Sequence, residues 1–440
     1  MGTNGRTGRK RYRKRNSKHT ASNGYAIHDP ESIVLLKWAK RNGISYGKLC
    51  PANFPQTGRG LMTSKRLRSG DLVISVPESM LISSKTANQS KIGKQLSELN
   101  LKPALSVKQM LCSFLLYEKY RGRTSFWYPY IKTLPKSFNT PAYFSEEEIQ
   151  PLPFDLQHES GVQVTTVRES YKGFKECLEE HSTLLDGKFV DFITFDEFRW
   201  AWFVVNTRSV YKADSKQTDC NGTLQRDNAF ALAPVLDLLN HMDTAEVNAG
   251  FNIESNKYEI YTMSCYNKGD QVFINYGPHD NRKLLLEYGF ILPKNVQNIV
   301  TIPRNLLYSV VMPKISGLSR RKKEVISSSQ LDKDLFCSGD SGLSWSTLVL
   351  LRILAMDEES FKRNWEKVLT GEKLSNEIEL KVAEWKESLL QRILECYKEF
   401  DCNTSHSQEH GCMSENMQLT LQLRNQEIQI LTNALEMVDP

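Results

Sequence analysis

The sequence lacks any long apolar run. None of its 440 residues lies in a stretch approaching eighteen uninterrupted apolar residues, and the longest candidate, Leu348 to Met356, is broken by Arg352. The start of the chain also lacks the apolar segment of a secretory signal, and Arg6 stands where myristoylation needs Ser or Thr. We therefore expect no contact with a membrane and no secretion.

Patterns for disulfides, metals and nucleotide phosphates are missing as well. The nine cysteines are an odd number with no regular spacing, which fits reduced thiols in the nucleus and cytoplasm. The cysteines and histidines of residues 396–412 do not follow a standard zinc-ligand spacing, so no metal is expected. Gly58 and Gly60 do not begin a dinucleotide fingerprint, because Thr63 replaces its third glycine.

Acidic residues are absent from the first 28 positions. Eight Lys and Arg residues precede Asp29, and removing their charge from the net +6 leaves −2 for the rest of the chain. Such a basic run is typical of a nuclear-import signal or a nucleic-acid-binding arm, and equally of a solvated terminus without a partner. We predict a disordered basic tail over residues 1–24, with nucleic acid as a candidate partner.

Hydrophobic periodicity predicts a mixed α/β core followed by a helical C-terminal part. Strands are predicted where short apolar runs alternate with turn residues, at 72–76, 251–253, 258–261 and 272–276. Helices are predicted where apolar residues recur every three or four positions, near 32–39, 111–119, 171–184, 195–205, 378–400 and 417–437. The polar segments 316–340 and 401–414 are interpreted as linkers.

Two segments concentrate residues that can do chemistry. An apolar run carries Asp237 and ends in Asn240 and His241, which taken alone is typical of a buried segment with a polar cap. Tyr276 and Tyr288 are each followed by Gly, and taken alone they are typical of core tyrosines beside capping glycines.

Together and in order, these segments resemble the SET-domain methyltransferases, in particular the subgroup typified by the plant Rubisco large-subunit lysine methyltransferase. The resemblance covers about residues 32–437 and includes the insertion motif from Ser125 to Pro135. Five ordered motifs are a more specific signal than any one of them. They are Thr57-Gly58-Arg59-Gly60-Leu61, Phe198-Arg199-Trp200 with Thr207-Arg208, Asp237-Leu238-Leu239-Asn240-His241, Gly269 to Gly277, and Glu287-Tyr288-Gly289-Phe290.

The resemblance implies an α+β fold of small curved β-sheets with a pseudoknot near the active site. It implies a SET domain over residues 25–300, split by a helical insertion at about 103–230. An all-α substrate-binding domain is expected over residues 301–440.

The resemblance also implies a reaction, in which the methyl group of S-adenosylmethionine passes to a lysine of a histone or non-histone protein. Tyr288 is implied to lie nearest the reacting centre and to orient the amine, while Tyr276 lines the same channel. Arg208 is implied to bind the cofactor carboxylate. No metal is implied, and a monomer is expected. The implied cofactor-binding residues are Gly60, Leu61, Met62, Arg208, Asp237, Asn240, His241, Tyr276, Tyr288, Gly289 and Phe290.

Other functions stay open from the sequence. A SET-fold module could use its channel only to hold a protein tail, although the presence of Tyr276, Tyr288, Asn240 and His241 together argues against it. The acceptor could also be histidine, although the hydroxyl of Tyr288 would crowd an imidazole. A nucleic-acid binder acting through residues 1–20 is the third alternative.

Overall fold

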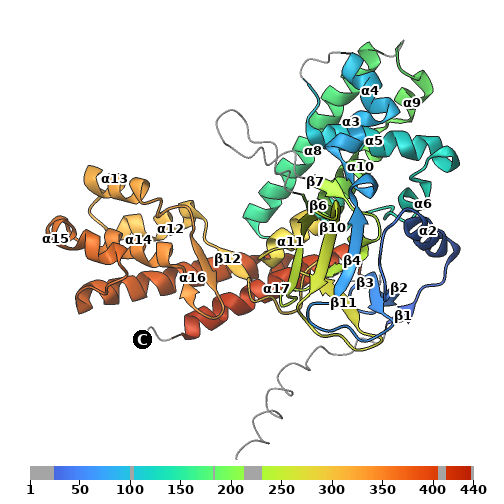
Figure 1. Ribbon diagram of the computed structural model, residues 1–440. Coiled ribbons are helices and arrows are strands. Elements are labelled where there is room, and N and C mark those ends of the chain that lie inside the picture. The colour runs from blue at the N-terminus through green and yellow to red at the C-terminus, as the bar shows by residue number, and fades with distance from the viewer. Residues whose placement is uncertain (1–23, 100–103, 182–183, 213–229, 405–412, 438–440) are drawn as a thin grey trace, which may run out of the picture. The chain divides into compact units, whose positions relative to one another are not determined.

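The computed structural model describes residues 24–99, 104–181, 184–212, 230–404 and 413–437 (Figure 1). Almost all of the predicted basic tail, and residues 405–412 of the cysteine- and histidine-bearing segment 396–412, lie outside these residues. Within them, no helix is long and apolar enough to cross a membrane.

The chain forms two compact units. The first consists of residues 1–138 and 165–278, and the second of residues 139–164 and 279–440. Both units are therefore discontinuous in sequence. These two units are defined by contacts within the folded chain. The boundary at residue 300, between the SET domain and the substrate-binding domain, is predicted from the motifs and stays a prediction.

Three small sheets make up the β-structure of the first unit. The five-stranded sheet has the order β1-β2-β3-β11-β8, and the others have the orders β4-β10-β9 and β5-β7-β6. The strands are β1 (Tyr25–Ala26), β2 (Leu49–Phe54), β3 (Gly58–Thr63), β4 (Leu72–Pro77), β5 (Ile82–Ser83), β6 (Ser209–Tyr211), β7 (Phe230–Leu232), β8 (Asn240–His241), β9 (Val247–Asn252), β10 (Lys257–Thr262) and β11 (Gln271–Ile274). The predicted strand positions are confirmed.

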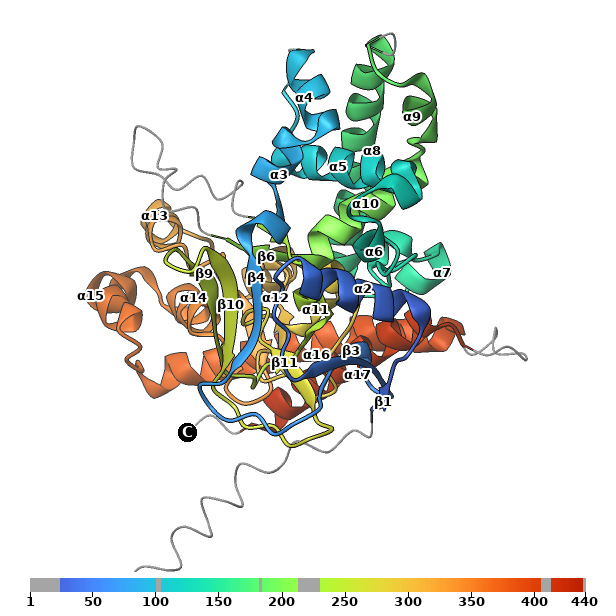
Figure 2. The ribbon, with the colours of Figure 1, turned by 45° about the vertical axis from the view of Figure 1, so that its right-hand side comes forward.

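The sheet of β4, β10 and β9 shows why these residues form strands (Figures 1 and 2). Asn256 takes a left-handed conformation with φ of 53°, which suits a tight turn, and Lys257 then pairs with Asn252 across the hairpin. Val73, Ile74 and Val76 of β4 are buried, as their apolar run predicts.

The first unit also contains helices, most of which gather beyond one end of these sheets (Figure 1). Ser106 and Gln109 form a reciprocal cap at the start of α5, and Thr194 caps α10, so both begin at a residue that suits a helix end. The helices are α2 (Pro30–Arg41), α3 (Ser84–Gln89), α4 (Lys91–Glu98), α5 (Val107–Arg121), α6 (Tyr128–Ile131), α9 (Gly187–Phe192) and α10 (Phe195–Arg208).

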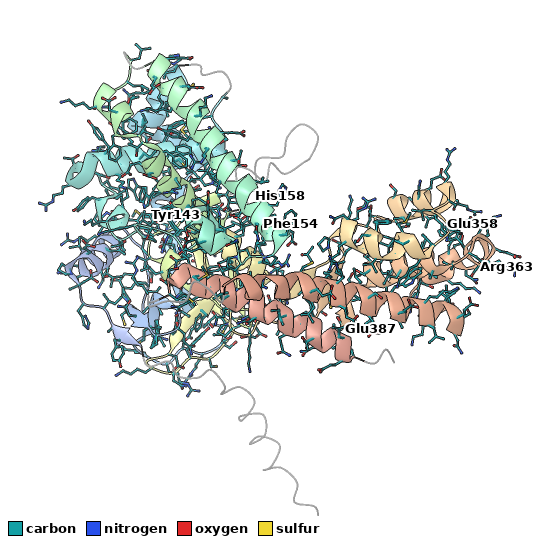
Figure 3. All side chains as sticks on the ribbon, turned by 180° about the vertical axis from the view of Figure 1, so that it is seen from behind. Tyr143, Phe154, His158, Glu358, Arg363 and Glu387 are labelled. Atoms are coloured by element: carbon teal, nitrogen blue, oxygen red, sulfur yellow. The ribbon has the colours of Figure 1, made fainter. Side chains whose placement is uncertain are left out.

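Helix α8 (Phe154–Glu180) begins in the second unit and ends in the first. Sequence periodicity predicts only its last part, from residue 171, because the preceding part is polar and contains Gly161. The side chain of Phe154 at its first turn is 83% exposed (Figure 3).

The second unit packs helices around a large apolar core that includes Leu350, Phe361 and Leu389. Its helices are α7 (Glu146–Ile149), α11 (Asn281–Tyr288), α12 (Arg304–Val311), α13 (Arg320–Ser328), α14 (Trp345–Ala355), α15 (Glu358–Leu369), α16 (Asn376–Thr404) and α17 (Glu415–Glu436). The predicted helices 378–400 and 417–437 are confirmed as α16 and α17.

Two expectations for this C-terminal part need correction. A small sheet of β12 (Ile299–Thr301), β13 (Phe336–Ser338) and β14 (Gly342–Leu343) accompanies the helices, so the part is not all-α. The predicted linker 316–340 is wrong, because it contains α13 and β13. Helix α13 is short and charged, and Val325 and Ile326 are its only apolar residues, so its sequence carries little hydrophobic signal.

Candidate active site

The five-stranded sheet brings three of the predicted motifs together in the first unit. Leu61 and Met62 of β3 pair with β11, and β11 pairs on its other side with Asn240 and His241 of β8. Tyr276 follows two residues after the end of β11. Leu61 and Val272, about 210 positions apart in sequence, therefore lie on adjacent strands, and β11 lies between β3 and β8 in the sheet.

Gly60 lies where backbone and side chains come unusually close. The Asn240 amide nitrogen Nδ2 donates to the carbonyls of Arg59, at 3.2 Å, and Thr57, at 3.3 Å. A Cβ atom on Gly60 would lie 2.8 Å from this nitrogen and 2.6 Å from Nε2 of Gln271. A residue without a side chain is therefore required here. Leu61 is fully buried, which leaves its backbone as the part suited to contact a ligand.

A buried charged cluster lies around Asp237. Its Oδ2 accepts from Arg208 Nη1 at 2.9 Å and from the Tyr130 hydroxyl at 3.0 Å. Burial opposes the charge of Arg208, but its interactions with Asp237, Tyr130 and Tyr276 together raise the pKa of the guanidinium. Burial, then Asp237, raises the pKa of Tyr130 well above its usual range, so this phenol stays a neutral donor.

A second guanidinium adds positive charge to this cluster. Arg59 donates to the carbonyl of Thr133, and its pKa is lowered by burial and then by repulsion from Arg208. Two guanidinium groups beside one carboxylate suit an anionic group of a ligand. Within the described residues, Arg208 Nε, Asp237 Oδ1 and Gln271 Nε2 are buried atoms without a hydrogen-bond partner.

His241 and Tyr276 orient each other. The Tyr276 backbone N–H donates to His241 Nδ1 at 3.0 Å, so Nδ1 acts as the acceptor of a neutral imidazole. The rings lie 5.1 Å apart with 33° between their planes. The Tyr276 hydroxyl donates to the carbonyl of Leu239 at 2.7 Å, which fixes the direction of its O–H bond.

Tyr288, Gly289 and Phe290 belong to the second unit, at the end of α11. Gly289 ends the helix in the left-handed conformation, with φ of 79°. The Tyr288 ring stacks on His279 with 6.0 Å between centroids. Burial, then Glu287, raises the pKa of the Tyr288 phenol, so it remains protonated at neutral pH.

The predicted residues thus divide between the two units. The first unit brings together Gly60, Leu61, Met62, Arg208, Asp237, Asn240, His241 and Tyr276. Tyr288, Gly289 and Phe290 form a separate group, so their sharing of one channel with Tyr276 stays a prediction. Sequence reasoning assigned no role to Arg59, Tyr130 and Gln271, although all three lie within the quoted motifs.

A cavity of about 560 Å³ opens elsewhere in the first unit, between α3, α5 and the segment after it. Phe114, Phe126 and Trp127 line it, but their rings pack edge to face with centroids 5.2–6.0 Å apart. The carboxylate of Glu118 is already bonded to Ser125 and Arg121. These rings and the Glu118 carboxylate are therefore already in contact with neighbouring groups of the cavity wall.

No cluster of three or more His, Cys, Asp or Glu residues suited to a metal ion occurs in the described part of the chain. The arrangement around Gly60 is instead one of amide donors, two guanidinium groups and a buried carboxylate.

Comparison with known proteins agrees with this geometry. A family model described as the SET domain matches residues 58–277. SET domain-containing protein 4 of Homo sapiens is 36% identical to the chain, over 84% of this chain and 83% of that protein. The chain belongs to the SET-domain family. The family assignment made from the ordered motifs is therefore confirmed.

Other SET-domain proteins extend the comparison. SET domain-containing protein 4 of Mus musculus is 35% identical, over 99% of this chain and 97% of that protein. The actin-histidine N-methyltransferase of Gallus gallus is 28% identical over 75% of this chain, which spans about half the length of that relative.

Solved structures confirm the SET fold. A structure titled Rubisco LSMT bound to AdoMet aligns over 93% of this chain and 91% of that one, with a TM-score of 0.60 and 21% identity. Another, titled the SET domain of LSMT bound to lysine and AdoHcy, aligns over 92% and 90%, with a TM-score of 0.61 and 20% identity.

Proposed function

We propose that the protein is an S-adenosylmethionine-dependent protein-lysine N-methyltransferase. The observation that carries this proposal is the cluster around Gly60, in which Asn240, Gln271, Arg208 and Asp237 converge in a SET fold. The similarity to structures titled as bound to AdoMet and to lysine supports both the cofactor and the acceptor.

The residues present fit S-adenosylmethionine. The guanidinium groups of Arg208 and Arg59 would hold its carboxylate, and the unused oxygen of Asp237 is suited to an ammonium or hydroxyl donor. Asn240, His241 and the backbone of Gly60 to Met62 would hold the remainder. When bound, the cofactor supplies an electrophilic methyl group on a positively charged sulfur.

The protein must present a neutral amine to this methyl group. A free lysine has a pKa of about 10.4, so the ammonium form dominates in water at pH 7. An apolar channel beside a positive charge favours the neutral amine by desolvation and by repulsion. The Tyr276 hydroxyl, which donates to the Leu239 carbonyl, and the protonated phenol of Tyr288 can orient the amine.

Histidine is a second candidate acceptor. The similarity of 28% to an actin-histidine N-methyltransferase favours it. Tyr288 argues for lysine, because its hydroxyl would occupy space that an imidazole needs. Mass spectrometry of the methylated residue distinguishes the two acceptors directly.

We also propose, from the sequence alone, that the protein is a monomer of the nucleus and cytoplasm acting on histone or non-histone proteins. Light scattering of the purified chain tests whether it is a monomer, and microscopy of a fluorescent fusion tests its location. Incubating the enzyme with nuclear and cytosolic proteins and labelled S-adenosylmethionine tests the function itself. A Tyr288→Phe enzyme is the control, and equal labelling of the same residues by both would exclude the role given to Tyr288.

A further inference from the structure

Helix α11 begins inside a buried charge network of the second unit. The Arg282 guanidinium donates two hydrogen bonds to the Glu427 carboxylate of α17, from Nε to Oε1 at 2.6 Å and from Nη2 to Oε2 at 2.8 Å. Nη2 also donates to the Tyr397 hydroxyl at 3.2 Å, and Nη1 pairs with Asp155. Arg282 is 8% exposed and Glu427 is 1% exposed, so water screens this pair little.

The network keeps one charge state. Burial opposes the charge of Arg282, but its interactions with Glu427, Tyr397 and Asp155 together raise the pKa of the guanidinium well above its usual range. Burial, then Glu427, raises the pKa of Tyr397 well above its usual range, so its hydroxyl stays protonated and donates to Glu427. Because the charged guanidinium donates two parallel hydrogen bonds to the carboxylate, the pair fixes the orientation of Arg282 relative to Glu427 as well as the distance between them.

The preceding position repeats this link between the same two helices. Asn281 Nδ2 donates to Gln426 Oε1 at 2.6 Å and to the Leu292 carbonyl at 2.8 Å. Its Oδ1 accepts from the Leu292 N–H at 3.0 Å, and Asn281 is fully buried. Two consecutive residues of α11 therefore bind Gln426 and Glu427, which are consecutive on α17.

The C-terminal end of α11 packs closely against the backbone of residue Asn139. A Cβ atom on Gly289 would lie 2.8 Å from the carbonyl carbon of Asn139. Leu285, between the two ends, is buried in a cluster with Leu156 and Leu423. From Arg282 to Tyr288 the helix rises only about 9 Å, so it moves as one body and a shift at its start displaces Tyr288.

We propose that Arg282 is a positioning residue for methyl transfer, whose ion pair with Glu427 fixes the helix that ends in Tyr288. This inference rests on the proposed function and on the role given there to Tyr288. Arg282 acts through α11 and not on the reacting atoms. The C-terminal helix α17, which supplies Glu427, then belongs to the catalytic apparatus.

The test compares variants of the full-length chain. Arg282→Met removes the charge, and Arg282→Met with Glu427→Leu replaces the buried pair by apolar side chains. Tyr397→Phe removes a single hydroxyl from the network. Arg363→Met is the matched control, because Arg363 pairs with Glu359 and both side chains are exposed. Figure 3 shows Arg363 on α15.

Four quantities are measured: hydrogen–deuterium exchange across the whole chain, the melting temperature, the affinity for S-adenosylhomocysteine, and the rate of tritiated methyl transfer from saturating S-adenosylmethionine to a fixed cell extract. For Arg282→Met we expect faster exchange confined to α11 and α17, and transfer reduced about tenfold to a hundredfold. Affinity for S-adenosylhomocysteine should fall less than transfer does, because the cluster around Gly60 is kept and only the predicted contacts of Tyr288, Gly289 and Phe290 are displaced. Arg363→Met should match the wild type throughout.

The double variant separates positioning from stability. Replacing a buried ion pair by apolar residues can restore stability, so its melting temperature should recover while transfer stays at least about tenfold low. Recovery of transfer together with the melting temperature would overturn the inference, as would faster exchange spread equally over α14 and α15.

If Arg282→Met does not fold, the Tyr397→Phe variant tests the inference in its place. Loss of its hydroxyl should reduce transfer about fivefold and speed exchange in α11, because the Arg282 fork loses one of its supports. Wild-type transfer and exchange in Tyr397→Phe would then overturn the inference. A wild-type enzyme that labels no protein would instead contradict the proposed function, while the exchange data would still report whether Arg282 fixes α11.

Discussion

The residues around Gly60 show which parts of the site are visible from sequence. The motifs identify Gly60, Asn240 and His241, because each residue stands in a short ordered pattern. The Tyr130–Asp237 hydrogen bond joins positions 107 apart in sequence, and no local pattern predicts it. The Gln271 amide approaches Gly60 because β11 pairs with β3, and hydrophobic periodicity does not predict which strands pair.

Gly60→Ala tests this close approach. The new methyl group would meet Nδ2 of Asn240 and Nε2 of Gln271, so we expect affinity for S-adenosylhomocysteine to fall at least about tenfold. Isothermal titration calorimetry measures it. Gly250→Ala in β9 is the control, because no atom lies within 4 Å of a Cβ there. Unchanged affinity in Gly60→Ala would argue against a cofactor site at this glycine.

The pH dependence of transfer follows from two groups. An unbound acceptor lysine loses its proton with a pKa of about 10.4, so kcat/KM should rise from pH 7 to about pH 10. Burial, then Glu287, raises the pKa of the Tyr288 phenol and moves loss of its proton to higher pH, so Tyr288 should cause no fall in rate below about pH 9. Initial rates across buffers of equal ionic strength measure the profile. A fall between pH 8 and 9 in a stable enzyme would contradict this account.

At the scale of the elements, the long helices and the alternating strands are predictable and the short or polar elements are not. Helices α16 and α17 carry apolar stripes, and β4 and β10 are apolar runs bounded by turns. Helix α13 and the three-residue strand β13 are stabilised by contacts with the rest of the second unit, so residues 316–340 show little of their structure in sequence.

Helix α13 offers a test of such a contact. Its buried Lys322 donates to the carbonyl of Met356, which caps the end of α14, and burial lowers the pKa of this ammonium. Lys322→Met should lower the free energy of unfolding by about 1–3 kcal/mol, since a buried carbonyl loses its partner. Chemical denaturation measures it, and Lys323→Met, at the exposed neighbouring position, is expected to change it little. Equal values for both variants would show that the contact contributes nothing.

At the scale of the whole molecule, the sequence predicts the SET fold and its helical C-terminal part, and the fold comparison confirms both. It does not predict the two discontinuous units. Residues 139–164 join the second unit through contacts such as that of Asp155 with Arg282, which only the folded chain reveals.

The charge distribution makes a separate prediction for the basic tail. Its eight positive charges stand before a chain of net charge −2, so deletion of residues 1–20 should remove most binding to DNA or RNA. Methyl transfer should stay within about twofold, because the predicted site lies outside the tail. Gel-shift titration at several salt concentrations measures the binding. If binding is undiminished after the deletion, residues outside the tail bind the nucleic acid, and the prediction is wrong.

The most direct measurement is mass spectrometry of nuclear and cytosolic proteins after incubation with the purified enzyme and S-adenosylmethionine bearing a deuterated methyl group. The account predicts the labelled methyl on lysine side chains of a small set of proteins, with labelling reduced at least about tenfold in Tyr288→Phe. Label found on histidine alone, or on no protein at all, would contradict it.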